Sequence, residues 1–84
     1  MANESILIVD DEEVWRDLVK VWLENGGYAN TISASTGQQA LAIAEKNPPD
    51  CILLDLVLPD QSGLAVCQKL RALPALCRTP VVLL

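Results

Sequence analysis

The 84-residue sequence contains no histidine and no phenylalanine, and its aromatic residues are two tryptophans and one tyrosine. Without histidine, the chain lacks the commonest general base and a common metal ligand. Without phenylalanine, a core must be built from aliphatic side chains, which are abundant because hydrophobic residues make up 51% of the sequence. This composition predicts one small folded domain and not a disordered segment.

Basic residues are also scarce. Six lysines and arginines stand against 11 acidic residues, which gives a net charge of −5. They form no cluster, so we expect neither nucleic acid nor a membrane surface as a partner of this segment. The sequence also lacks an apolar run long enough to cross a bilayer, and Met1 to Glu4 lack the basic start of a secretory signal.

The three cysteines, Cys51, Cys67 and Cys77, are odd in number and do not have the spacing of a metal site. We therefore expect free thiols in a reducing compartment, which together with the missing secretory signal predicts a cytoplasmic location.

Two short apolar runs end in carboxylates. Residues 5–9 are followed by Asp10 and Asp11, and residues 51–54 are followed by Asp55. Short apolar runs bounded by turn signals are typical of parallel strands buried on both faces. An acid that follows such a strand lies at the carboxyl edge of the sheet, where open parallel sheets bind their ligands.

The rest of the chain alternates between strand and helix patterns, which predicts an α/β fold with a doubly wound parallel sheet. The second strand has few bulky apolar residues and suits a sheet edge, so we expect the strand order 2-1-3-4. We expect strands over 5–9, 28–33, 51–54 and 79–84, and helices from about Glu12 or Glu13 to Asn25, from Thr36 to Asn47, and from Ser62 or Gly63 to Leu73.

Two helix starts carry capping signals. Asp11 or Glu12 can accept hydrogen bonds from the free N–H groups of the first helix. Thr36 and Gln39 fit a capping box, in which Thr36 is the N-cap and Gln39 reaches back to it. An alternative interpretation of the acids is therefore that they only cap a helix and end a strand.

In the expected strand order, Asp10, Asp11 and Asp55 meet at one edge of the sheet. Three carboxylates in one place repel one another unless a cation offsets their charge. Oxygen ligands without histidine or cysteine favour Mg²⁺ or Mn²⁺ over zinc. A carboxylate beside such a metal can itself take up a phosphoryl group, so the cluster predicts a site for a divalent metal and a phosphate.

The same residues resemble a known family. Residues 8–12 (Ile-Val-Asp-Asp-Glu), followed by Asp55 with Pro59 four and Gly63 eight residues later, resemble the receiver domain of two-component response regulators. The resemblance implies a flavodoxin-like doubly wound sheet. It extends along residues 1–84 but covers the N-terminal portion of the family's fold, so we expect an incomplete receiver domain, truncated after the fourth strand. The fourth helix, fifth strand and fifth helix would be absent.

The resemblance also implies a role for each acid. Asp55 would be the phosphoacceptor, which takes a phosphoryl group from a sensor histidine kinase or a phosphotransfer protein. Asp11 would bind Mg²⁺ (or Mn²⁺) directly and Asp10 would hold it through water, while Asp55 and the backbone carbonyl of Val57 would complete the protein ligands. The domain would be a signalling module that assists its own phosphorylation, and not an enzyme.

Other functions remain as alternatives. The chain could be a receiver-like interaction module that is not phosphorylated, because the family's later switch positions fall outside these residues. An exposed fourth-strand edge would then favour a homodimer. A haloacid-dehalogenase-type phosphohydrolase expects an acid where Val57 stands, and a dinucleotide-binding fold expects glycines where Asp10 and Asp11 stand. Trp15, about one helical turn beyond Asp11, is either a packing residue or a neighbour of the metal site.

Overall fold

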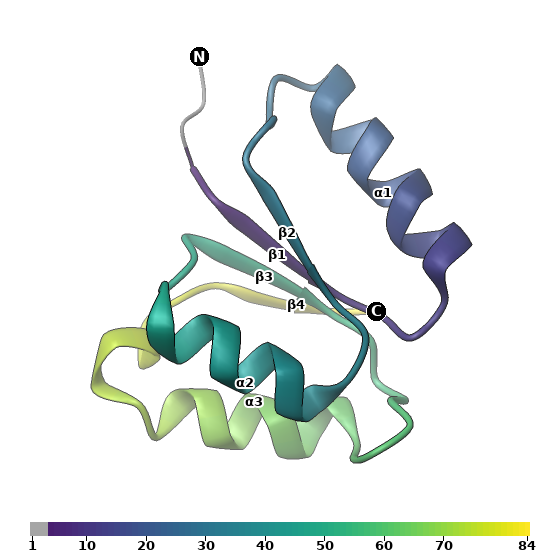
Figure 1. Cartoon of the computed structure of the whole chain (residues 1–84). Helices are drawn as coiled ribbons and strands as arrows, with labels where there is room; N and C mark the ends of the chain where they lie inside the picture. Colours follow the sequence, from purple (N-terminus) through teal and green to yellow (C-terminus); the bar gives the residue numbers. More distant parts are fainter. Residues whose placement is uncertain (1–3) are drawn as a thin grey trace.

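The computed structural model describes residues 4–84 and shows a parallel four-stranded sheet with α1 on one face and α2 and α3 on the other (Figure 1). The expected domain also includes residues 1–3, which lie outside the described residues. The elements are β1 (Ile6–Val9), α1 (Glu13–Asn25), β2 (Thr31–Ala34), α2 (Gly37–Lys46), β3 (Cys51–Leu54), α3 (Gly63–Arg71), the 3₁₀ turn η1 (Pro74–Leu76) and β4 (Val81–Leu83). None of the helices within residues 4–84 has the length and apolarity to cross a membrane.

The strand order is β2-β1-β3-β4, which confirms the predicted flavodoxin-like arrangement. β1 occupies the centre and pairs in parallel with both β2 and β3. In this register, Val9 at the end of β1 lies opposite Ala34 on one side and Leu54 on the other. The carboxyl ends of the three strands are therefore level, and the residues that follow them emerge at the same edge.

The core lies between the sheet and the layer formed by α2 and α3. Small residues on α2, Ala40 and Ala44, are fully buried and let that helix approach the sheet closely, while α3 contributes Val66 and Leu70. All four residues of β1 are buried, as expected for a central parallel strand. The main core cluster consists of Leu7, Val9, Ala34, Ala40, Ala44, Ile52, Leu54, Leu58, Val66, Leu70 and Leu76.

The opposite face of the sheet is covered less completely. Every residue of α1 keeps at least partial exposure, and Trp22 is 76% exposed. An apolar groove of about 660 Å³ lies between α1 and the sheet, lined by residues that include Trp22, Leu53 and Val82. As a result, β3 is only partly buried on this side, in contrast to the prediction that it would be buried on both faces.

Several element boundaries differ from the prediction: β1 begins at Ile6, β4 covers Val81–Leu83 and not 79–84, and larger differences follow α1 and α3. β2 begins at Thr31 and not at Tyr28, because the turn after α1 takes up these residues: Gly27 has a φ of 94°, and the Tyr28 N–H donates back to the carbonyl of Leu23. α3 ends at Arg71 and not at Leu73, and Pro74 then begins η1. After α1 the turn delays the start of β2, whereas at α3 the helix itself is shorter than predicted, and the Leu73 N–H donates to the carbonyl of Leu70 in the turn that follows it.

The helix starts also correct the sequence analysis. Glu12 is the N-cap of α1, but no side-chain capping bond forms there, so the prediction that Asp11 or Glu12 caps this helix was wrong. Instead, Asp10 Oδ1 accepts from the Glu12 N–H at 3.0 Å. At α2 the Thr36 hydroxyl accepts from Gln39 N–H as predicted, whereas the Gln39 side chain bonds to the backbone and hydroxyl of Ser35 and not to Thr36.

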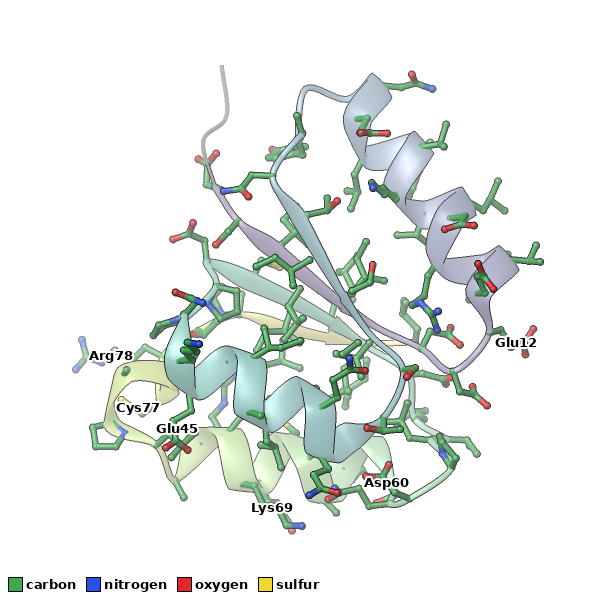
Figure 2. All side chains as sticks on the ribbon, viewed as in Figure 1. Glu12, Glu45, Asp60, Lys69, Cys77 and Arg78 are labelled. Atoms are coloured by element: carbon green, nitrogen blue, oxygen red, sulfur yellow. The ribbon has the colours of Figure 1, made fainter. Side chains whose placement is uncertain are left out.

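An acid from a distant part of the chain also caps α2. Asp60, in the loop between β3 and α3, accepts from the Gly37 N–H through Oδ1 and from the Gln38 N–H through Oδ2, both at 2.9 Å. These bonds favour the ionised form and lower the pKa of Asp60 to about 2. Figure 2 shows Asp60 in this loop, beside the first turn of α2.

We predict that Asp60→Asn lowers the thermal unfolding midpoint at neutral pH, because an amide offers one acceptor oxygen and no charge to the helix N-terminus. Folding lowers the pKa of Asp60 from 3.8 to about 2, so its stabilising effect is complete above the unfolded value and is lost as the pH falls through the folded value. The difference in midpoint between the native chain and the variant should therefore narrow over this interval. A difference that stays constant down to the folded pKa would contradict the assignment.

Candidate functional site

The pairing of β1 with β3 places the acids that follow these strands side by side. The Asp55 N–H donates to the carbonyl of Val9 at 3.0 Å, and the Asp10 N–H donates to the carbonyl of Ala34 at 3.1 Å. The sheet hydrogen bonds thus continue one residue beyond the strands and include the backbone of both acids. Asp10 and Asp55 are therefore held by the most deeply buried part of the structure.

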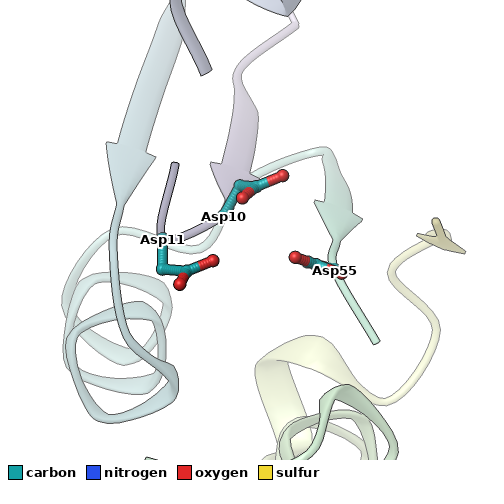
Figure 3. Close-up of side chains that lie close together, drawn as sticks. All are labelled: Asp10, Asp11 and Asp55. Carbon is teal, nitrogen blue, oxygen red and sulfur yellow. The ribbon is translucent and has the colours of Figure 1, made fainter. Parts of the chain in front are cut away.

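Three carboxylates meet at this edge. Asp10, Asp11 and Asp55 each contribute an oxygen, and these oxygens lie within 4.8 Å of one another. Figure 3 shows the three side chains gathered in the space beyond the ends of β1 and β3. Their exposure is graded, since Asp10 is buried, Asp55 is partly buried and Asp11 is exposed. The structure therefore brings together the three acids that the sequence analysis selected.

The electrostatic environment of Asp10 opposes its ionisation. Burial raises the pKa of Asp10, and the nearby charges of Asp55 and Asp11 raise it further, while the hydrogen bond from the Glu12 N–H and the charge of Arg16 act in the opposite direction. Arg16 donates through Nη1 to the backbone carbonyl of Asp10. The cluster thus carries unbalanced negative charge, which a cation would offset.

The loop after Asp55 folds back on that residue. The Val57 N–H donates to Asp55 Oδ1 at 3.2 Å, and the Gly63 N–H donates to the carbonyl of Leu56 at 2.7 Å. A Cβ atom on Gly63 would overlap the backbone carbonyl oxygen of Asp55, so this close approach requires glycine. The Val57 side chain is 76% exposed, and the backbone of Val57 makes the hydrogen bond to Asp55. The role of the Val57 carbonyl as a metal ligand stays a prediction.

A cavity of about 320 Å³ opens at the acid cluster, lined by Asp10, Glu12, Trp15, Asp55 and Leu84. The hydrogen bond from the Leu84 N–H to the carbonyl of Leu54, at 2.9 Å, brings the end of the fourth strand to this cavity. Trp15 borders this cavity and also the apolar groove between α1 and the sheet, so the structure is compatible with both interpretations offered for this residue.

Two residues that support the site were not predicted from the sequence. Arg16 bonds to the backbone of Asp10, and Asp60 fastens the loop after Asp55 to α2. Arg16 had a detectable signal: a cation in the first turns of a helix is unfavourable with respect to the helix dipole, which suggests a nearby acid. Asp60 gave no such signal, because its partners are 23 and 22 residues away in the sequence.

Comparison with known proteins supports the resemblance to response regulator receiver domains. A family model for the response regulator receiver domain matches residues 6–84. The alkaline phosphatase synthesis transcriptional regulatory protein PhoP of Bacillus subtilis is 48% identical over 69 residues, which cover 82% of this chain and 28% of PhoP. The transcriptional regulatory protein SrrA of Staphylococcus aureus is 45% identical over 84 residues, which cover all of this chain and 33% of SrrA. The chain thus spans about a third of the length of these curated relatives.

Solved structures share the fold. The chemotaxis response regulator CheY4 of Vibrio cholerae has a TM-score of 0.92 and 29% identity, over 98% of this chain and 68% of that chain. The receiver domain of the sensor histidine kinase PA1611 from Pseudomonas aeruginosa, solved with a magnesium ion coordinated in its active site cleft, has a TM-score of 0.91 and 30% identity, over 98% of this chain and 66% of that chain. From the sheet order, the acid cluster and these similarities together, the chain belongs to the family of response regulator receiver domains.

Proposed function

We propose that this receiver domain accepts a phosphoryl group on Asp55 from a sensor histidine kinase or a phosphotransfer protein. Asp10, Asp11, the Asp55 carboxylate and the backbone carbonyl of Val57 would hold Mg²⁺ or Mn²⁺ beside it. The observation that carries this proposal is the convergence of three carboxylates within 4.8 Å at the edge of the sheet. A cytoplasmic location, expected from the free thiols of Cys51, Cys67 and Cys77, belongs to the same proposal.

The residues present fit a hard divalent cation. The side chains that converge offer only carboxylate oxygens, which suit Mg²⁺ better than zinc. Burial and like charge disfavour the ionised form of Asp10 and raise its pKa, so a bound cation would relieve a repulsion that the fold otherwise sustains. When bound, Mg²⁺ would neutralise charge on the carboxylates and on the entering phosphoryl group.

The residues around Asp55 favour its action as a nucleophile. Its side chain is partly exposed at the cavity, so a phosphoryl donor can reach it. The Val57 N–H holds Oδ1, which leaves Oδ2 free to attack phosphorus. In that step an oxygen–phosphorus bond forms, the phosphorus–nitrogen bond of the phosphohistidine breaks, and the donor imidazole leaves. An ionised carboxylate needs no general base, which is consistent with a chain without histidine.

We predict that incubation with Mg²⁺ and a small acyl phosphate, such as acetyl phosphate, adds one phosphoryl group to the native chain. Phosphoryl transfer depends mainly on positioning and charge neutralisation, which this acid cluster would supply. Intact mass spectrometry measures the adduct, which should be absent without Mg²⁺ and absent in Asp55→Asn.

The matched control is Asp50→Asn, which removes one acid immediately before β3, at the other end of the strand, and should leave the adduct in place. An adduct that persists in Asp55→Asn would contradict the assignment of the phosphoacceptor. A native chain that takes up no phosphoryl group would instead support the alternative of an interaction module that is not phosphorylated.

A second prediction concerns stability. In the presence of a chelator, Asp10→Asn should unfold at a higher temperature than the native chain, because it removes a buried charge and its repulsion with Asp55 while an acceptor for the Glu12 N–H remains. Mg²⁺ at ten times its Kd should stabilise the native chain by about 1.4 kcal/mol and the variant by less. Thermal unfolding with and without Mg²⁺ measures both effects. A native chain that is already the more stable of the two in chelator would refute the repulsion argument.

Trp15 provides a third prediction, because it lines the same cavity as Asp10 and Asp55. In a Trp22→Phe background, where Trp15 is the remaining tryptophan, Mg²⁺ should change the tryptophan fluorescence. The change should disappear after Asp11→Ala. An equal response in both proteins would show that the fluorescence reports something other than occupancy of this site.

A further inference from the structure

The loop between Asp55 and α3 carries the backbone that surrounds the phosphoacceptor, and several contacts hold it in place. The hydrogen bond from the Gly63 N–H to the carbonyl of Leu56 closes the loop on itself, and Leu58 is buried with 7% exposure in the core. Val57 and Ser62 form an isolated antiparallel bridge across the loop. A further hydrogen bond, from the Leu56 N–H to the carbonyl of Leu84 at 3.4 Å, joins the loop to the end of β4. None of these contacts reaches α2.

Asp60 provides an anchor of a different kind, because it joins this loop to α2. Its two oxygens accept from the first two N–H groups of that helix, those of Gly37 and Gln38. The Asp60 carboxylate is itself held, since Gln61 Nε2 donates to Oδ2 at 3.3 Å and Lys69 Nζ donates to Gln61 Oε1 at 2.8 Å. These bonds direct the exposed Asp60 carboxylate toward the helix.

The start of α2 is seated tightly against this loop. A Cβ atom on Gly37 would come within 2.7 Å of Gln61 Cγ and of Val66 Cγ2, which is closer than van der Waals contact allows. The absence of a side chain at Gly37 thus lets the helix start approach close enough for both of its N–H groups to reach Asp60.

The hydrogen bonds of Asp60 complete a series of linked segments around the acid cluster. From Asp55 the chain leads to Asp60, and the Asp60 hydrogen bonds lead to the start of α2. α2 is joined to β2, whose last residue, Ala34, accepts from the Asp10 N–H. Val9, next to Asp10, accepts in turn from the Asp55 N–H. The backbones of Asp10 and Asp55 are therefore held by hydrogen bonds to neighbouring strands, and Asp60 adds a link from the loop after Asp55 to α2.

We propose that Asp60 is a positioning residue for the acid cluster, and that its bonds to α2 hold the loop so that Val57 and Asp55 keep the geometry needed for metal and phosphoryl binding. The inference rests on the proposed function. The competing explanation is that Asp60 only caps α2 and contributes to stability alone.

Thr36→Ala separates these explanations, because it removes a different capping bond from the same helix start. Thr36 accepts from the Gln39 N–H, so its loss weakens α2 without releasing the loop from the helix. Asp60→Asn weakens the same helix start and also loosens the loop. Both variants should be compared with the native chain at a temperature at which circular dichroism shows all three to be folded.

The first measurement is the Kd for Mg²⁺ by isothermal titration calorimetry. Asp60→Asn should weaken binding about tenfold, the lower end of the range for residues that orient metal ligands, whereas Thr36→Ala should change it by less than about twofold. Gly37→Ala is an independent variant that keeps Asp60 and separates the helix from the loop, and it should weaken Mg²⁺ binding in the same direction as Asp60→Asn. Equal Kd values in Asp60→Asn and the native chain, or equal losses in Asp60→Asn and Thr36→Ala, would overturn the proposal.

The second measurement needs no metal. Amide hydrogen exchange of loop residues 56–62 should be faster in Asp60→Asn than in Thr36→Ala, because Asp60→Asn removes the charge and one of the two acceptor oxygens that link the loop to α2, whereas Thr36→Ala leaves both in place. Faster exchange with an unchanged Mg²⁺ Kd would show that the loop moves without affecting the site and would reject the positioning role. Failure of the proposed function appears separately, as a native chain that neither binds Mg²⁺ nor forms the Asp55 adduct.

Discussion

The register between β1 and β3 is the constraint on which the site depends. Val9 pairs with Leu54, and both are almost fully buried, so the residues that follow them must emerge together at the edge of the sheet. A slip of one residue would move an acid by about 3.3 Å and turn its side chain to the other face of the sheet. The hydrophobic core that forbids such a slip therefore also fixes the distance between Asp10 and Asp55.

This arrangement places charge where the fold tolerates it poorly. Asp10 sits at the end of a buried strand, and its neighbours include the carboxylates of Asp11 and Asp55. Folded proteins seldom keep such repulsion without a compensating partner. The graded exposure of the three acids is consistent with the proposed function, in which a cation would lie among the carboxylates and a phosphoryl donor would approach from outside. The repulsion among these carboxylates thus lowers the stability of the metal-free fold and at the same time favours binding of a cation.

The two faces of the sheet contribute unequally to the site. On one face α2 and α3 pack closely, and the Asp60 bonds to Gly37 and Gln38 tie the loop after β3 to that layer. On the other face α1 leaves an apolar groove of about 660 Å³ beside the sheet. The geometry of the acid cluster is therefore supported mainly from the α2–α3 side, while α1 contributes Arg16 and Trp15 at its first turns.

The sequence by itself determined the element types, the strand order and the three acids, because each follows from a local pattern: a short apolar run, a stop signal and a charge at its end. It could not determine how the side chains near the site pair. Asp11 and Glu12 have the right position to cap α1, yet neither side chain forms a capping hydrogen bond. Instead, the Asp10 side chain accepts from the Glu12 N–H. Gln39 bonds to Ser35 and not to Thr36, and Asp60 reaches a helix 22 residues earlier. Such choices depend on which groups the packed sheet and helices bring within hydrogen-bonding distance, and only the tertiary structure decides that.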